Sequence, residues 1–112
     1  MKATLPLRAK GVCCAPTITL APDRAAASAE LLKALADPTR LQILGVLKRA
    51  AEPVCICDFT AAFDLSQPTI SHHMGKLKDA GLVEATRSGI WSYYRLARSL
   101  DARARALLEV LV

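Results

Sequence analysis

Apolar residues recur at the spacing of an α-helix through much of this 112-residue chain. The pattern predicts one helix over residues 23–35, a second over residues 38–49 and a last one after Ser99, each with leucines and alanines along one face. Polar residues supply the expected helix starts, because Asp23, Asp37 and Ser99 can each act as an N-cap. The chain is therefore expected to be mainly helical.

A shorter helical pair is predicted in the middle of the chain. Residues 54–57 are expected to be extended, and Asp58 to cap a short helix. After a three-residue turn, Ser66 should cap a helix over residues 67–80. The buried face of that helix consists of apolar residues at positions i, i+4 and i+7, namely Ile70, Met74 and Leu77. Two helices joined by so short a turn indicate a helix-turn-helix.

The next segment alternates in the way that a β-hairpin does. Residues 82–87 and 90–96 are rich in β-formers and flank Ser88-Gly89, which predicts a hairpin with those two residues as its turn. A hairpin directly after a helix-turn-helix is the layout of a winged helix-turn-helix. The predicted fold class is thus mainly α with a small β-hairpin wing.

The second helix of the pair carries side chains suited to reading DNA bases. Its first turns are polar, short-chained and uncharged; Gln can pair with adenine, and the methyl group of Thr can pack on that of thymine. Basic residues further along and in the hairpin suit phosphates or the minor groove. An amphipathic helix with a merely solvated polar face is the alternative. The candidate DNA-binding residues are Ser66, Gln67, Thr69, Ser71, His72, Lys76, Arg87 and Arg95.

Composition agrees with a nucleic-acid partner. Fifteen Lys and Arg against ten Asp and Glu give a net charge of +5. No apolar run approaches the ~20 residues of a membrane span, and Lys2, Pro6, Arg8 and Lys10 interrupt any secretory signal, so a cytoplasmic protein without a membrane partner is expected. The glycines are scattered and form no loop that could cradle a phosphate, and the sequence contains no nucleophile–base arrangement. An enzyme is therefore not expected.

Two domain parts are predicted. Residues 1–22 contain three prolines and no helical period, which indicates a flexible N-terminal arm. Residues 23–112 should form one winged helix-turn-helix domain that binds DNA and dimerises. The hydrophobic fraction of 53% is high for so small a domain, which favours an oligomer.

Four cysteines come as two close pairs, Cys13-Cys14 in the arm and Cys55-x-Cys57 before the helix-turn-helix. In a reducing compartment such pairs point to metal or redox chemistry before structural disulfides. If residues 54–57 are extended, Cys55 and Cys57 share one face and can bind one soft ion, with Cys13 and Cys14 supplementing them. The helix N-terminus and the basic chain should help to deprotonate the thiols. Packing in the core and a redox switch are the alternatives.

Three stretches resemble the ArsR/SmtB family of bacterial metal-responsive repressors, over about residues 23–111. They are Leu35-Ala36-Asp37-Pro38-Thr39-Arg40-Leu41, Cys55-Ile56-Cys57-Asp58-Phe59, and Leu65-Ser66-Gln67-Pro68-Thr69-Ile70-Ser71-His72-His73. The resemblance implies a homodimeric repressor that binds operator DNA when free of its effector and leaves it when a metal or metalloid binds. The Cys-x-Cys-Asp element is similar to that of arsenite, antimonite and cadmium/lead sensors.

The family pattern also indicates where this chain departs from it. Thr60 stands where arsenite sensors often have a third cysteine, so attention moves to Cys13 and Cys14, which resemble the arm cysteines of cadmium/lead sensors. The last helix lacks the His of the family's other metal site. The sequence is interpreted as an arsenite-responsive repressor with the ligand set Cys13, Cys14, Cys55 and Cys57. It would bind an inverted-repeat operator as an effector-free homodimer and dissociate when As(III) or Sb(III) binds. A Cd, Pb or Zn sensor and a thiol redox sensor are the alternatives.

Overall fold

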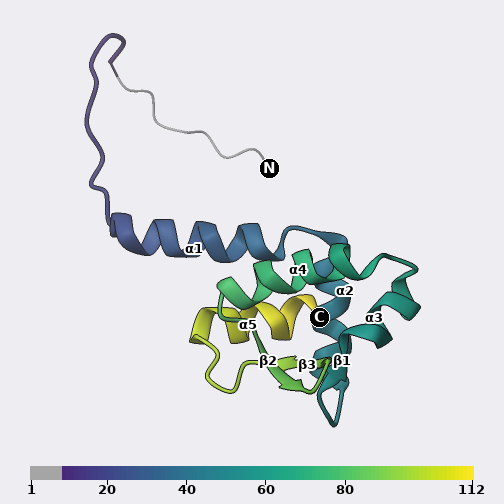
Figure 1. Cartoon of the computed structure of the whole chain (residues 1–112). Helices are drawn as coiled ribbons and strands as arrows, with labels where there is room; N and C mark the ends of the chain where they lie inside the picture. The colour runs from purple at the N-terminus through teal and green to yellow at the C-terminus, as the bar shows by residue number, and fades with distance from the viewer. Residues whose placement is uncertain (1–8) are drawn as a thin grey trace, which may run out of the picture.

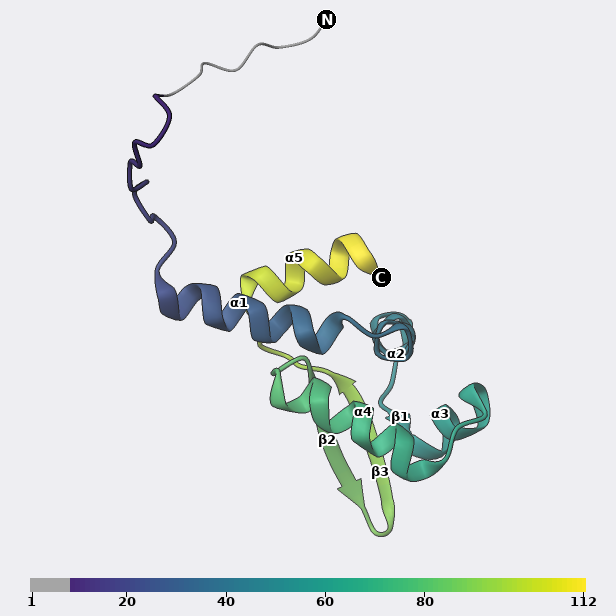
Figure 2. The same cartoon turned by 90° about the horizontal axis from the view of Figure 1, so that it is seen from above.

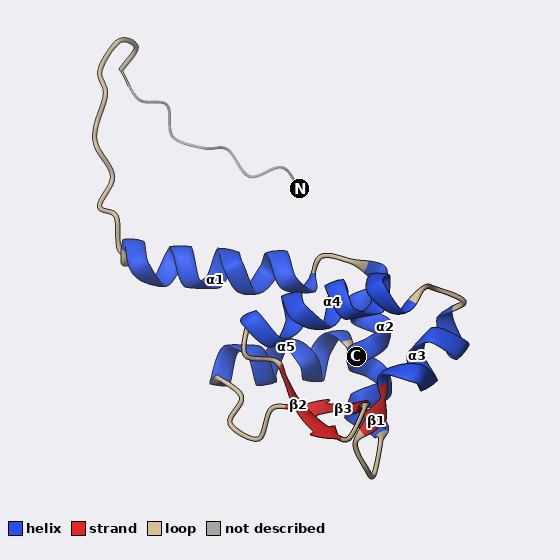
Figure 3. Cartoon of the chain, viewed as in Figure 1, coloured by secondary structure: helices blue, strands red, loops and turns tan. Residues whose placement is uncertain are grey.

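The computed structural model describes residues 9–112 (Figure 1). Within them lie five helices: α1 (Pro22–Leu35), α2 (Pro38–Arg49), α3 (Ile56–Phe63), α4 (Gln67–Asp79) and α5 (Ala102–Leu111). Three strands accompany them, β1 (Val54–Cys55), β2 (Val83–Ser88) and β3 (Trp91–Leu96). Helices α3 and α4 form the helix-turn-helix and the β2–β3 hairpin its wing (Figure 3). The predicted fold class, mainly α with a small wing, is confirmed.

The core is organised around α4. Ile70, Met74 and Leu77, the predicted buried face, are fully buried. They pack in one cluster with buried side chains from the other elements, including Leu35, Ile43, Leu44, Phe59, Leu82 and Leu108. Because α4 is anchored by three fully buried side chains, its polar residues are held on the outer side of a rigid helix.

The sheet has the order β1-β3-β2 and is antiparallel. β1 is only two residues long, with Val54 opposite Tyr94 and Cys55 opposite Tyr93. Ser88 pairs with Trp91 in the hairpin, so the turn residues are Gly89 and Ile90. The predicted turn was therefore one residue too early; Gly89 has φ of 62°, a left-handed conformation that glycine adopts without strain.

Helix starts were predicted correctly at two positions and wrongly at three. Asp37 and Ser66 cap α2 and α4, accepting hydrogen bonds from the backbone N–H of Arg40 and Thr69. The N-cap of α1 is Ala21, because Pro22 takes the first helical position and the carboxylate of Asp23 accepts only from the adjacent Arg24 N–H. The other two errors concern α5 and α3.

α5 begins later than predicted, with Asp101 as its N-cap in place of Ser99. The Asp101 carboxylate accepts from the backbone N–H of Arg103 at 2.8 Å. Leu100 packs against the core before the helix starts. This contact keeps the chain in a loop beyond Ser99, so the helix is capped two residues further on.

The described part of the arm, residues 9–21, leaves the N-terminal end of α1 without forming a helix or strand (Figure 1). Its side chains are exposed, Cys13 and Cys14 among them. Residues 1–8 of the predicted arm lie outside the described residues. No helix in the described range is both long and apolar enough to traverse a bilayer.

Candidate thiol site and DNA-binding surface

Cys55 lies where β1 ends and α3 begins, and it is the N-cap of α3. Its Sγ accepts a hydrogen bond from the backbone N–H of Cys57 at 3.4 Å, while its own N–H donates to the Asp58 carboxylate at 3.2 Å. Asp58, predicted to be the N-cap, is thus wrongly placed: it is the third residue of the helix and reaches back to cap Cys55. A cysteine that acts as an N-cap is fixed in direction by the helix start.

The sulfurs of Cys55 and Cys57 converge to 2.7 Å. The prediction that residues 54–57 are all extended is wrong, because Ile56 and Cys57 belong to the first turn of α3. The two sulfurs meet for a different reason: an N-cap side chain folds over the first-turn N–H groups, which brings Cys55 Sγ to Cys57. Cys55 is 6% exposed and Cys57 is exposed, so the pair is open to solvent on one side.

The surroundings of Cys57 favour its thiol over its thiolate. Its hydrogen bond to Cys55 raises the pKa of Cys57 above the ordinary thiol value, and desolvation and the charges of Cys55 and Asp58 raise the pKa further. These effects outweigh the backbone hydrogen bonding that lowers it. The expectation that the helix N-terminus and the basic chain would favour the Cys57 thiolate is therefore wrong. An ion that binds here must displace a proton.

The described residues supply two sulfurs to this site and no third ligand. Thr60 lies one helical turn after Cys57, and its hydroxyl donates to the Cys57 carbonyl oxygen at 2.8 Å. No group of three His, Cys, Asp or Glu side chains able to hold a metal occurs anywhere in residues 9–112. The exposed Cys13 and Cys14 lie on the arm, at the far end of α1 from α3 (Figure 1).

The predicted base-reading residues cluster on the first turns of α4, and hydrogen bonds order several of them. Ser66 Oγ and Thr69 Oγ1 are 2.8 Å apart, and Gln67 Nε2 donates to Ser71 Oγ at 2.9 Å. His72 is exposed. These short polar side chains are thus held at the exposed N-terminal end of the helix, where base edges can be reached.

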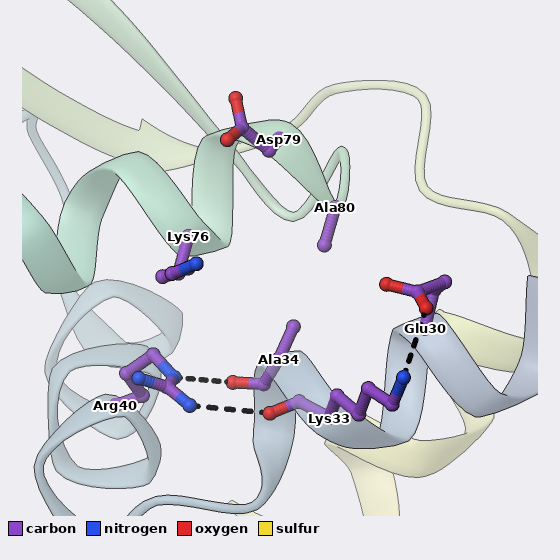
Figure 4. A pocket seen from close by; sticks show the side chains of 7 residues that line it. All are labelled: Glu30, Lys33, Ala34, Arg40, Lys76, Asp79 and Ala80. Carbon is purple, nitrogen blue, oxygen red and sulfur yellow. Dashed lines mark hydrogen bonds and ion pairs between the residues drawn. The ribbon is translucent and has the colours of Figure 1, made fainter.

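The predicted basic contacts lie in three different surroundings. Lys76 lines an open cavity of about 450 Å³ between α1, α2 and α4, together with Glu30, Lys33 and Asp79 (Figure 4). Arg87 is exposed near the end of the hairpin. Arg95 is already engaged, donating to the Glu84 carboxylate at 2.8 Å. Arg95 is therefore the one of the three that is paired with a carboxylate, whereas Lys76 and Arg87 are exposed.

Sequence reasoning missed the role of Arg40. From the first turn of α2 its guanidinium donates to the carbonyl oxygens of Ala34 at 2.6 Å and Lys33 at 3.1 Å (Figure 4). The guanidinium also lies 3.2 Å from Nδ1 of His73. The residue satisfies carbonyls that the end of α1 leaves without helical partners, and it ties α1 to α4. The Asp37-Pro38 start signal placed α2 but carried no information on where Arg40 points.

The model of the family described as "Bacterial regulatory protein, arsR family" matches residues 37–85 of this chain, from the N-cap of α2 to the first strand of the wing. An uncharacterized HTH-type transcriptional regulator of Methanocaldococcus jannaschii is 39% identical over 83 residues, which cover 74% of this chain and 89% of that protein. The arsenical resistance operon repressor of Escherichia coli is 40% identical over 80 residues, 71% of this chain and 68% of that protein.

A solved structure extends the likeness to the whole fold. The homodimeric winged helix-turn-helix DNA-binding domain of a Mycobacterium bovis protein is 32% identical, with a TM-score of 0.64 over 84% of this chain and 85% of that one. The α3–α4 pair, the wing and these relatives agree. This chain is a member of the ArsR family of DNA-binding transcriptional repressors.

Proposed function

We propose that this repressor responds to trivalent arsenic or antimony, and that Cys55 and Cys57 form the fixed part of its effector site. The observation that carries the proposal is the convergence of the two sulfurs at the start of α3. Thiolates are soft ligands, and the pair lies at the entrance to the helix-turn-helix. The name of the Escherichia coli relative, an arsenical resistance repressor, supports an arsenical over other soft ions.

The raised pKa of Cys57 favours arsenous acid over a metal cation. Arsenous acid exchanges hydroxide for thiolate, and the proton of each thiol leaves with one hydroxide as water. The raised pKa of Cys57 is therefore no obstacle to arsenic binding. A cadmium, lead or zinc ion must instead release that proton to solvent, at a cost that rises as the pH falls.

Trivalent arsenic takes three sulfurs, so the site needs one more thiol than α3 supplies. Thr60 does not provide it, which leaves Cys13 or Cys14. Either arm cysteine would tie the arm to the start of α3. Cys13, Cys14, Cys55 and Cys57 remain the proposed ligand set, with three of the four engaged by one arsenic.

We further propose that the repressor binds operator DNA as a homodimer formed by α1 and α5. Leu32 on α1 and Val110 and Leu111 on α5 are large apolar side chains that are half or more exposed. The two helices lie together on one side of the molecule (Figure 2). A two-fold dimer would set its α4 helices about 34 Å apart, which suits an inverted repeat.

The ion would act on DNA through α3. Binding shifts the start of α3, which packs on α4, and the two reading helices lose the spacing of the operator. A coupling of ~3 kcal/mol between effector and DNA would weaken operator binding by ~150-fold.

A Cys55→Ser variant tests the site, because Ser is a good N-cap and preserves the start of α3. We expect the effector-free variant to bind operator as the wild type does but to stay bound when arsenite is added, in a fluorescence-anisotropy titration. Ser99→Ala, at an exposed position in the loop before α5, is the control and should release normally. Release of the Cys55→Ser variant at the wild-type arsenite concentration would contradict the proposed site.

A redox-sensing repressor is the second candidate, favoured by the 2.7 Å separation of the sulfurs. A peroxide would take two electrons from the two thiols, giving a Cys55–Cys57 disulfide and water. Release of operator by peroxide without any ion, reversed by dithiothreitol, would support this candidate over arsenite sensing.

A further inference from the structure

The end of the wing carries two large apolar side chains that the protein does not cover. Ile90 is 82% exposed and Trp91 is 49% exposed. Ile90 belongs to the two-residue turn, and Trp91 lies on the face of β3 opposite Tyr94 and Leu96, which pack against the core. Neither side chain belongs to the core cluster, so neither stabilises the fold of a single chain by packing in its core.

The charge around this apolar end is positive. Between residues 85 and 94 the only charged side chain is Arg87. Glu84, the nearest acidic residue along the chain, accepts hydrogen bonds from Arg95 and from the backbone N–H of Arg98. Glu52 lies in a hollow beside Thr86 and Tyr93, where Arg95 and Arg98 balance its charge. The tip of the hairpin thus presents two apolar side chains beside the guanidinium of Arg87. This combination suits double-stranded DNA, whose phosphates are negative and whose stacked bases are apolar.

The tip also lies on the side of the molecule that would meet DNA. The hairpin turn and the N-terminal end of α4 both point away from α5 (Figure 2). With α4 in the major groove, a hairpin that projects past the helix end reaches the flanking minor groove.

We propose that Ile90, flanked by Trp91, forms an apolar wedge that contacts the minor groove beside each half-site and reads how easily the DNA there deforms. The inference rests on the proposed DNA-binding mode of α4 and adds a second source of specificity. Apolar side chains pressed against minor-groove base steps part the stacked bases, which is least costly at pyrimidine–purine steps. Arg87 beside the wedge gains from the negative potential of a narrow minor groove.

The test compares DNA selected from a random duplex pool by the wild type, by Ile90→Ser and by Ile18→Ser. Ile18 is 84% exposed on the arm and undergoes the same apolar-to-polar change, so it is the matched control. We expect all three proteins to select the same central motif. Only Ile90→Ser should lose the preference for deformable flanking steps, with roughly tenfold weaker binding to the best wild-type duplex.

The fluorescence of Trp91, the only tryptophan of the chain, gives a second readout. The selected duplex should shield Trp91 from acrylamide quenching. Unchanged quenching, or an unchanged flank preference in Ile90→Ser, would overturn the wedge while leaving the central motif intact. If the wild type selects no motif at all, the proposed function of α4 fails instead. A smaller sedimentation coefficient for Ile90→Ser without DNA would assign the tip to contacts between copies and overturn the wedge as well.

Discussion

The thiol site depends on one residue acting in two ways. Cys55 caps α3 with its sulfur, and in the proposed site the same sulfur would bind the ion. A ligand at Cys55 must therefore compete with the hydrogen bond from Cys57 N–H. In the proposed mechanism, ion binding at Cys55 and the loosening of the start of α3 are therefore the same event.

The pH dependence of operator release should separate arsenite from cadmium. Arsenite consumes each thiol proton as water, so its half-effective concentration should change little between pH 6 and 8. Cadmium must instead displace the proton of Cys57 into solvent, because the raised pKa favours the thiol. The half-effective concentration of cadmium should therefore rise about tenfold for each pH unit of acidification and each proton released. Anisotropy titrations at three pH values measure both, and equal slopes for the two ions would contradict the assignment.

Thr60→Cys should make the arm thiols dispensable. Position 60 lies one helical turn after Cys57, on the same side of α3. In a Cys13→Ser/Cys14→Ser background, which we expect to be unresponsive, Thr60→Cys should restore release by arsenite. Thr60→Ser in the same background is the control. If the triple variant stays bound to operator, the third ligand does not approach from that side.

At the scale of elements, the helices whose start signals are unambiguous were predicted best. Asp37-Pro38 and Ser66 are common capping residues, and α2 and α4 begin where they indicate. α3 was misplaced because cysteine is not a usual N-cap and Asp58 is, so propensity pointed three residues too late. That both thiols face one point followed from the cap geometry and not from the extended strand that the sequence suggested.

The remaining parts of the site depend on contacts between distant residues, which local pattern does not carry. The guanidinium of Arg40 meets carbonyls of the preceding helix and a histidine 33 residues away. Likewise, the pairing of Cys55 with Tyr93 joins the thiol site to the wing through a strand of two residues. The sequence predicted the hairpin and a possible strand over residues 54–57, but not that β1, which covers two of those residues, pairs with β3.

The cap of α2 should be measurable in stability. Asp37→Ala removes the acceptor of Arg40 N–H and should cost about 1 kcal/mol, whereas Asp37→Asn keeps a good cap and should cost a few tenths. Urea unfolding at pH 7 compares them. Similar losses for both variants would show that the charge of Asp37, rather than its cap, is what matters.

Acid should remove the advantage of the Asp37 charge. The hydrogen bond from Arg40 N–H, with the charges of His73 and Arg40, holds the pKa of Asp37 below its ordinary value. A lowered folded-state pKa stabilises the fold above the unfolded-state pKa of ~3.9, and the gain is lost as the pH falls through the folded pKa. The difference between wild type and Asp37→Asn should therefore shrink below about pH 4.

At the scale of the whole molecule, the position of the arm decides which subunits share an effector. α1 is 14 residues long, or about 21 Å, and it separates the arm from the end of the molecule that holds α3. An arm that served its own α3 would have to reverse and run back along α1. We therefore expect each arm to reach the α3 of the partner.

Mixing two unresponsive variants tests this expectation. In a heterodimer of Cys55→Ser with Cys13→Ser/Cys14→Ser, one complete site forms if the arm reaches across, and none forms if it folds back. Arsenite should thus release operator from the refolded mixture but from neither parent homodimer. A mixture as unresponsive as its parents would place arm and α3 thiols in the same subunit.

With Cys55 as a proposed ligand, we expect the two-residue strand β1 to set how fast the repressor responds. A strand held by two residue pairs, Val54 with Tyr94 and Cys55 with Tyr93, is a weak local structure. Its backbone should open far more often than the protein unfolds, and each opening uncovers the buried thiol of Cys55. The rate of induction then depends on local opening of β1 rather than on global unfolding. Changes that speed amide hydrogen exchange at β1 should therefore also speed the association of arsenite.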